Sequence, residues 1–272
     1  MSDDVLLVEV EDGIATVTLN RPDARNALNT ALRAAIPRTM VELDQRDDVQ
    51  AIVLTGADPA FCAGLDLKEL GSGENALGAS GTESQAGERP PKSASSKPHR
   101  PGPFPTVDTL VIGAVNGVAI TGGFELALAC DFLVASERAR FADTHARVGI
   151  MPGWGLTVLL PEAIGLRRAK EMSTTGNFID ADTALRWGLV NHVVPHEELL
   201  PFARKLAADS ITVPRKSQHR MLQTYEEGAR RDGAGQWALE AEVAKAWQGA
   251  GIDPSEIEAR RKDVMARGRT QV

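Results

Sequence analysis

Two apolar runs that lead into glycine constrain the fold most strongly. The runs AIVLTG (51–56) and TLVIGAVNGVAI (109–120) are rich in β-branched residues and lack the polar alternation of a strand with one face in water. Such runs are typical of strands buried on both faces, which occur mainly where helices cover a parallel sheet. Each run leads into a glycine-rich junction, within FCAGLDLKEL (61–70) and TGGFELALACD (121–131). We therefore expect an α/β fold in which buried strands alternate with helices.

The remaining patterns predict further strands and helices. VLLVEVEDGIATVTLN (5–20) divides at Asp12-Gly13, a hairpin signal, and short strands are expected at 132–136, 140–144 and 190–195. Helices are expected over 31–45, 123–129, 161–173 and 180–187, and Pro37 predicts a kink or a late start in the first of them. After residue 195 the pattern is helical only, over 197–209, 214–230, 233–249 and 254–267.

These patterns divide the chain into an α/β core over residues 1–195 and a helical C-terminal region over 196–272. Residues 71–105, about half of them Gly, Ser or Pro, are expected to form a flexible surface insertion in the core. Apolar side chains of the helical region, such as Trp237 and Leu239, need a cover, which the core or a second subunit can supply.

Composition excludes several classes of protein. The 272-residue chain has a formal net charge of -7, which argues against a nucleic-acid partner that needs a basic face. The N-terminal segment has acidic residues where a signal peptide needs Lys or Arg, and no run of about eighteen apolar residues follows, so we expect a cytoplasmic protein without a membrane span. Cys62 and Cys130 have neither a disulfide framework nor metal-site spacing, which indicates buried structural thiols.

The two junctions are candidates for oxyanion binding. A helix N-terminus presents unpaired N–H groups, and the small pairs Ala63-Gly64 and Gly122-Gly123 allow a ligand to approach them. The plainer interpretation is that these glycines only form tight turns. Glu125, in the first turn of an apolar helix, has two interpretations as well: a favourable charge at the helix dipole, or a buried carboxylate that serves as a general acid or base.

At these residues the sequence resembles the enoyl-CoA hydratase/isomerase family, the crotonases. The matching segments are LNRPDARNAL, AFCAGLDLKEL, VNGVAITGGFELALACD, ADTHARVGIMPG and TGNFIDADTALRWGLVNHVVP, so the resemblance covers nearly the whole chain apart from 71–105. It implies a spiral of ββα units with a helical C-terminal region for trimerisation, and thus a homotrimer or a dimer of trimers. The substrate would be an acyl-CoA thioester, with coenzyme A as part of the substrate, no separate cofactor and no metal.

The resemblance also assigns roles to individual residues. Backbone N–H groups of Ala63 and Gly122 would hold the thioester oxygen, and Glu125 matches the first of the two glutamates that hold water in a hydratase. Residues matching the coenzyme A and substrate site are Arg25, Ala27, Leu28, Asp66, Leu67, Gly153 and Trp154. Trp154 and Leu156 stand where many hydratases have small residues, so a narrowed acyl pocket is expected.

The second glutamate position is occupied by His145. Three interpretations remain open: His145 transfers protons, it hydrogen-bonds water or Glu125 while Glu125 acts alone, or it is structural in an enzyme of altered chemistry. Asp143 is expected on the opposite face of an extended segment and therefore not in the site. The four other histidines are expected to be structural or solvated: His99, His192, His196 and His219.

Three functions are compatible with these residues. The first is hydration of a trans-2-enoyl-CoA, with Glu125 activating water and either Glu125 or His145 protonating C2. The second is double-bond isomerisation, for which one carboxylate suffices. The third is binding of acyl-CoA without turnover, for which the missing second glutamate is the argument.

Overall fold

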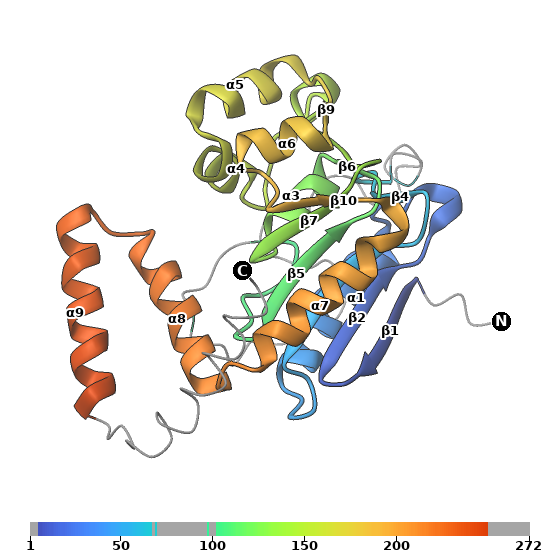
Figure 1. Cartoon of the computed structure of the whole chain (residues 1–272). Helices are drawn as coiled ribbons and strands as arrows, with labels where there is room; N and C mark the ends of the chain where they lie inside the picture. The colour runs from blue at the N-terminus through green and yellow to red at the C-terminus, as the bar shows by residue number, and fades with distance from the viewer. Residues whose placement is uncertain (1–4, 67–68, 70–96, 98–101, 250–272) are drawn as a thin grey trace. The chain divides into compact units, whose positions relative to one another are not determined.

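The computed structural model describes residues 5–66, 69, 97 and 102–249, and its strands form two sheets (Figure 1). The larger has the order β1 (Leu6–Glu11), β2 (Ile14–Leu19), β3 (Ala51–Gly56), β5 (Leu110–Val115), β7 (Phe132–Ser136) and β10 (His192–Val194). The smaller has the order β4 (Ala60–Cys62), β6 (Val118–Ile120), β8 (Arg140–Ala142) and β9 (Ile179–Asp180). Among the described strands, only the β1–β2 and β8–β9 pairs are antiparallel, so the predicted α/β class with parallel strands is confirmed.

The chain passes three times from the larger sheet to the smaller, from β3 to β4, from β5 to β6 and from β7 to β8. This alternation is the expected spiral of ββα units. The single long strand predicted over 109–120 is wrong, because the chain leaves the larger sheet at Val115 and enters the smaller at Val118. Gly117 permits the turn between them, since a Cβ at this position would lie 2.9 Å from the Ala60 Cα. The Asn116 side chain fixes the turn by donating a hydrogen bond to Asp58 at 2.9 Å.

The helices follow most of the predicted ranges. They are η1 (Pro22–Ala24), α1 (Thr30–Asp44), α3 (Gly122–Leu128), η2 (Ala146–Val148), α4 (Leu156–Ile164), α5 (Leu166–Thr175), α6 (Ala181–Trp187), η3 (His196–Glu198), α7 (Leu199–Ile211), α8 (Arg215–Gly228) and α9 (Gly233–Gly249). The Asn29 side chain caps α1 by accepting from the Leu32 N–H, so α1 does not start late but runs through Pro37. The helix predicted over 161–173 is two helices, since Gly165 at φ 84° separates α4 from α5. The helix predicted over 254–267 lies outside the described residues.

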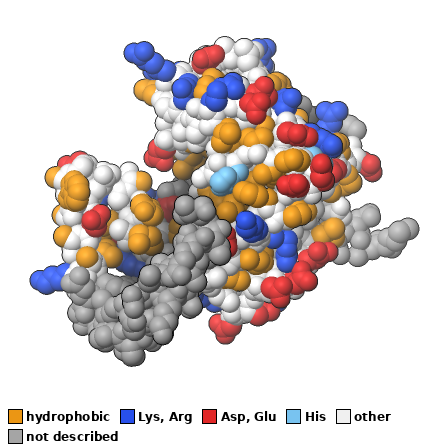
Figure 2. Space-filling view, in the orientation of Figure 1, with side chains coloured by type: hydrophobic (Ala, Val, Ile, Leu, Met, Phe, Trp, Pro, Cys, Tyr) orange, Lys and Arg blue, Asp and Glu red, His pale blue; other side chains and the backbone are white. Residues whose placement is uncertain are grey.

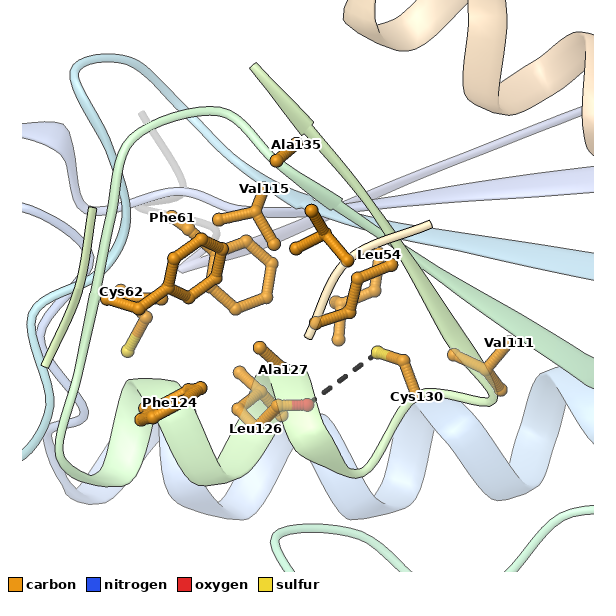
Figure 3. Close-up of a cluster of buried hydrophobic side chains, with 14 of the residues drawn as sticks. Leu54, Phe61, Cys62, Val111, Val115, Phe124, Leu126, Ala127, Cys130 and Ala135 are labelled. Carbon is orange, nitrogen blue, oxygen red and sulfur yellow. Dashed lines mark hydrogen bonds between the residues drawn. The ribbon is translucent and has the colours of Figure 1, made fainter. Parts of the chain in front are cut away.

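Helix α3 is fixed by the hydrophobic core (Figure 3). Its Phe124 and Leu126 are fully buried against the strands, and the Phe124 ring lies 5.7 Å from that of Phe141 on β8. At the C-terminal end of α3 the Cys130 thiol donates to the Leu126 carbonyl at 3.6 Å. Burial of one such side chain contributes about 1.5–3 kcal/mol. The core therefore holds α3, and with it Glu125, in one position against β4 and β6 of the smaller sheet.

The core extends beyond its expected limits. Most of the predicted insertion over 71–105 lies outside the described residues, but Lys97 and Phe104 near its end are buried, and the Lys97 amine lies 3.6 Å from Asp131. This end of the segment is therefore not a surface insertion.

Helix α7 packs against β3, β5 and β7, as Figure 1 shows, and the compact unit runs from Met1 to Arg220, past the boundary expected at 195. A second unit comprises Met221–Val272. Among the described residues, no helix has the length and apolar character of a membrane span.

Candidate active site

The N-terminus of α3 lies against the strand-to-helix junction that follows β4. Thr121 precedes the helix at φ 53°, a strained value for a residue with a Cβ, and its hydroxyl bonds that of Thr144 at 2.6 Å. Gly123 lies so close to β4 that an added Cβ would be 2.7 Å from both the carbonyl carbon and the Cβ of Cys62. A Cβ on Gly64 would lie 3.5 Å from the Gly122 nitrogen. The two junctions predicted from sequence are therefore neighbours in space.

Two backbone amides at this contact have no acceptor within the described part of the chain. Around Gly64 the chain forms a parallel bridge in which the Leu28 N–H donates to the Gly64 carbonyl at 2.7 Å and the Asp66 N–H donates to the Leu28 carbonyl at 3.3 Å. This pattern leaves the Leu65 N–H unpaired. The Gly122 N–H is unpaired because it lies in the first turn of α3.

Ala63, which the family resemblance assigned to the oxyanion site, is not available for that role. Its N–H donates to the Arg25 carbonyl at 3.0 Å. The assignment is wrong because the bridge with Leu28 turns alternate amides in opposite directions, so that the free one is two residues further on. Gly122 retains its predicted place, with Leu65 as its neighbour.

Glu125 is buried, with 2% of its surface exposed, and its two carboxylate oxygens have different surroundings. Oε1 accepts hydrogen bonds from the backbone N–H groups of Trp154, at 2.7 Å, and Leu156, at 3.4 Å. These donors lie at the start of α4, so both the hydrogen bonds and the helix dipole stabilise negative charge on the carboxylate. Oε2 lies 3.5 Å from Nε2 of His145. Glu125 is therefore an anchored carboxylate that faces one imidazole.

His145 is held on its other side by Asp143, which corrects the expectation that Asp143 faces away. The Asp143 carboxylate accepts from Nδ1 of His145 at 2.7 Å and from the His145 backbone N–H at 3.1 Å. The extended backbone ends with β8 at Ala142, and His145 has helical angles of φ -52° and ψ -52° before η2. The expectation was wrong because residues two apart in an extended segment share a face, and the turn into η2 keeps both side chains on the inner side, with 1% and 3% of their surfaces exposed.

The buried neighbours Asp143, His145 and Glu125 influence one another's charge. Burial by itself lowers the pKa of His145, but hydrogen bonds and negative charge from Asp143 and Glu125 outweigh it and raise the pKa to about 9. Burial raises the pKa of Asp143, whereas hydrogen bonds from His145 and Ser173 and the imidazolium charge hold it below its usual value. At neutral pH His145 is thus an imidazolium, with Asp143 on one side and Glu125 on the other. Within the described residues no group of three or more His, Cys, Asp or Glu side chains is arranged to hold a metal ion.

The predicted coenzyme A residues lie on both sides of the Leu28–Leu65 bridge. Ala27 and Leu28 are buried, Arg25 is exposed with a left-handed φ of 51°, and Asp66 pairs with Arg21 at 2.9 Å. The Arg21 guanidinium also donates to the Ala27 carbonyl, so Arg21 joins the two segments. Sequence reasoning missed this role, although Arg21 is part of the LNRPDARNAL segment. Leu67 lies outside the described residues.

The tryptophan at position 154 faces the start of α3. A Cβ on Gly122 would lie 3.6 Å from Cζ3 of Trp154, and Gly153 beside it is exposed. The Trp154 ring therefore lies beside Gly122, and its backbone N–H donates to Glu125.

The two cysteines, and a serine that is hydrogen-bonded to a histidine, have structural roles. Burial raises the pKa of Cys62 to about 12 and raises that of Cys130 as well, so both stay protonated and unreactive. The His196 imidazole lies between Ser136 and Asp58 and is hydrogen-bonded to each at 3.0 Å. The Ser136 hydroxyl is fully buried and also accepts from the Arg138 N–H, so this group ties β7 to η3 and is not a catalytic triad.

The three other histidines that the structure describes lie elsewhere, without a hydrogen bond or ion pair to Glu125. His192 packs edge-on against Phe202 with ring centroids 5.1 Å apart. His219 is half-buried, and burial together with the charge of Arg215 lowers its pKa. His99 lies outside the described residues. Of the histidines that the structure describes, His145 alone belongs to the site.

Known proteins resemble this chain over most of its length. A family model described as enoyl-CoA hydratase/isomerase matches residues 9–250. The chain belongs to this family.

Individual members are similar over most of their length. The chain is 35% identical over 269 residues to a probable peroxisomal enoyl-CoA hydratase 1 of Arabidopsis thaliana, which covers 98% of this chain and 96% of that protein. It is 39% identical over 221 residues to a probable enoyl-CoA hydratase of Mycobacterium leprae, with 81% and 80% covered. The crystal structure of an enoyl-CoA hydratase from Mycobacterium smegmatis is 44% identical, with a TM-score of 0.71 over 90% of this chain and 99% of that one. These members support the crotonase fold.

Proposed function

We propose that the protein is an enoyl-CoA hydratase, which adds water across the double bond of a trans-2-enoyl-CoA. The observation that carries this proposal is the buried pair of Glu125 and His145, 3.5 Å apart, beside two unpaired amides. A hydratase needs one group to take a proton from water and another to give a proton to carbon. The relatives named as enoyl-CoA hydratases support the same reaction. Isomerisation needs only one such group and leaves the imidazolium without a role.

The reaction starts from ionised Glu125 and protonated His145. The N–H groups of Leu65 and Gly122 hold the thioester oxygen, which withdraws electrons from C3. Glu125 accepts a proton from water as the water oxygen bonds to C3 and negative charge moves onto the thioester oxygen. His145 then donates its Nε2 proton to C2 as the enolate collapses to the 3-hydroxyacyl thioester. Transfer of the proton from Glu125 to His145 restores the starting state.

Binding of the coenzyme A portion is assigned to the segments joined by the Leu28–Leu65 bridge. Arg25 is exposed and offers positive charge for the phosphates, while Ala27, Leu28, Asp66 and Leu67 supply backbone groups and apolar contact. The substrate itself brings coenzyme A, so the proposal involves no further cofactor and no metal. Trp154 and Gly153 are assigned to the acyl pocket, because the Trp154 ring lies beside Gly122 and its bulk would limit the acyl chain there.

The test is incubation with crotonyl-CoA while loss of the conjugated thioester absorbance is followed. Glu125→Gln should lower kcat by about 100-fold or more, because general acid–base catalysis contributes 10²- to 10⁴-fold. Glu137→Gln, the same change at an exposed carboxylate after β7, should have no effect. Hydration that survives Glu125→Gln would overturn the mechanism. Tight binding of enoyl-CoAs without turnover would instead show an acyl-CoA-binding protein, and conversion of 3-enoyl-CoA without hydration would show an isomerase.

We also propose that the chain assembles as a trimer or as a dimer of trimers. The support is apolar surface on the helical unit, where Met221, Tyr225 and Trp237 are exposed by 58%, 71% and 75%. Figure 2 shows apolar side chains of this unit at the surface among acidic and basic ones, which is unfavourable unless another surface covers them. Light scattering after gel filtration should give three or six chain masses, and Trp237→Glu should lower that mass.

A further inference from the structure

The proposed acid–base mechanism uses Glu125 and His145 but not the third member of the buried chain, Asp143. With 1% of its surface exposed, Asp143 is a carboxylate without access to water. Burial of a charge costs several kcal/mol unless the charge is paired and hydrogen-bonded. The Asp143 contacts are the Nδ1 and backbone N–H of His145, together with a hydrogen bond to Ser173. Most of what offsets its burial is therefore His145 itself.

The contacts define which proton His145 can give. An ionised carboxylate only accepts hydrogen bonds, so the 2.7 Å contact requires a hydrogen on Nδ1. The opposite nitrogen, Nε2, is the one that faces Glu125. A neutral His145 with its hydrogen on Nε2 would turn a lone pair toward the Asp143 oxygen. Asp143 therefore excludes that tautomer, and Nε2 gains or loses the proton while Nδ1 keeps its own.

We propose that Asp143 is a positioning residue of this site: it orients His145 through Nδ1 so that the Nε2 proton is the one directed at the reacting groups beside Glu125. This inference rests on the proposed hydration, for which His145 is the proton donor. The alternative is that Asp143 is structural, since its bond to the His145 backbone N–H stabilises the turn into η2. An asparagine at 143 would keep that backbone bond and remove only the charge.

Two charged side chains affect the protonation of His145. Within the described part of the chain, the charged groups that act on His145 are Asp143, just after β8, and Glu125, on α3. Arg147 on η2 is exposed and donates to the Thr175 carbonyl at 2.6 Å, away from the imidazole. A change of charge at Asp143 should thus reach His145 without compensation from a neighbouring side chain.

The experiment compares wild-type protein with Asp143→Asn, and Asp58→Asn is the matched control. Asp58 also contacts a histidine, His196, at 3.0 Å, but outside the site. We expect Asp143→Asn to lower kcat for crotonyl-CoA hydration about 100-fold or more, with a smaller change in KM. In this variant, activity should be lost at a pH about one unit or more lower than in the wild type. The reason is that loss of the adjacent negative charge lowers the pKa of His145 by that amount. Asp58→Asn should change neither quantity.

Nuclear magnetic resonance of ¹⁵N-histidine-labelled protein gives a readout that needs no turnover. In the wild type, His145 should stay doubly protonated up to about pH 9 and then lose the Nε2 proton while retaining Nδ1–H. In Asp143→Asn the pKa should fall and both neutral tautomers should appear. A His145 that titrates normally in the wild type, or an unchanged pH profile in a folded Asp143→Asn, overturns the inference. Failure of the wild type to hydrate any enoyl-CoA overturns the proposed function instead, and the resonances still show whether Asp143 sets the proton on His145.

Discussion

The two glycines that open α3 give a sharp test, because the structure predicts opposite behaviour for them. A Cβ on Gly123 would lie 2.7 Å from two atoms of Cys62, an overlap of about 0.8 Å relative to the shortest favourable carbon–carbon separation of ~3.5 Å. One of these atoms is a backbone carbonyl carbon, which cannot rotate away. In Gly122→Ala the nearest atom is instead Cδ1 of Leu28, at 3.3 Å, the end of a flexible side chain. Gly123→Ala must therefore displace α3, whereas Gly122→Ala fits with a small adjustment.

The magnitudes follow from these contacts. We expect Gly123→Ala to lower the free energy of unfolding by about 3 kcal/mol, at the upper end of ordinary overpacking. Displacement of Glu125 by nearly 1 Å should lower kcat about 100-fold. Gly122→Ala should change stability by less than about 1 kcal/mol but lower kcat/KM, because the methyl group stands beside the amide that holds the thioester oxygen.

Denaturant unfolding and crotonyl-CoA hydration measure both effects. Gly102→Ala is a suitable control, because its Cβ would have only an ordinary contact, 3.5 Å from the Phe104 carbonyl oxygen. A Gly123→Ala protein with normal stability and normal kcat would refute the packing argument. A Gly122→Ala protein with full activity would remove Gly122 from the oxyanion site.

Three further outcomes are expected. The folded-state pKa of His145 is raised from 6.5 to about 9, so the folded state binds its proton more tightly; this stabilisation is complete below pH 6.5 and lost as pH rises through 9. The stability advantage of wild type over His145→Gln should thus shrink by about 3 kcal/mol at most between pH 6 and pH 10, and a constant difference would contradict the pairing. Leu65→Pro, which removes the unpaired N–H, should lower kcat about 10²- to 10³-fold while Leu65→Ala does not; equal kcat values would exclude this amide. Trp154→Ala should raise kcat/KM for long-chain relative to short-chain enoyl-CoAs by about 10-fold, and an unchanged preference would show that the ring does not limit the acyl chain.

Much of the fold follows from local patterns in the sequence. The hairpin at Asp12-Gly13 and the strands at 51–56 and 132–136 lie at the predicted residues, because turn residues and continuous apolar runs act over a few neighbours. The errors lie where packing decides the path of the chain. The run 109–120 is continuous in hydrophobicity, yet it supplies one strand to each sheet, and the turn between them packs so closely on the Pro59–Ala60 backbone that position 117 has no room for a side chain.

The site shows the same division. Glycine-rich junctions, an acidic residue in an apolar helix and the place of His145 are features of sequence, and they identified the region of Glu125. Which amide remains free depends on the bridge between Leu28 and Leu65, which lie far apart along the chain, and no local pattern reports that pairing. Asp143 and His145 are two residues apart and would share a face even in a strand, but only the structure shows that this face is buried and that the two side chains are hydrogen-bonded. The sequence by itself determined the order of elements and the chemical groups available, because these depend on near neighbours. Only the tertiary structure decided which donors stay unpaired and which carboxylates share one imidazole, because hydrogen bonds between distant segments fix the direction of each group.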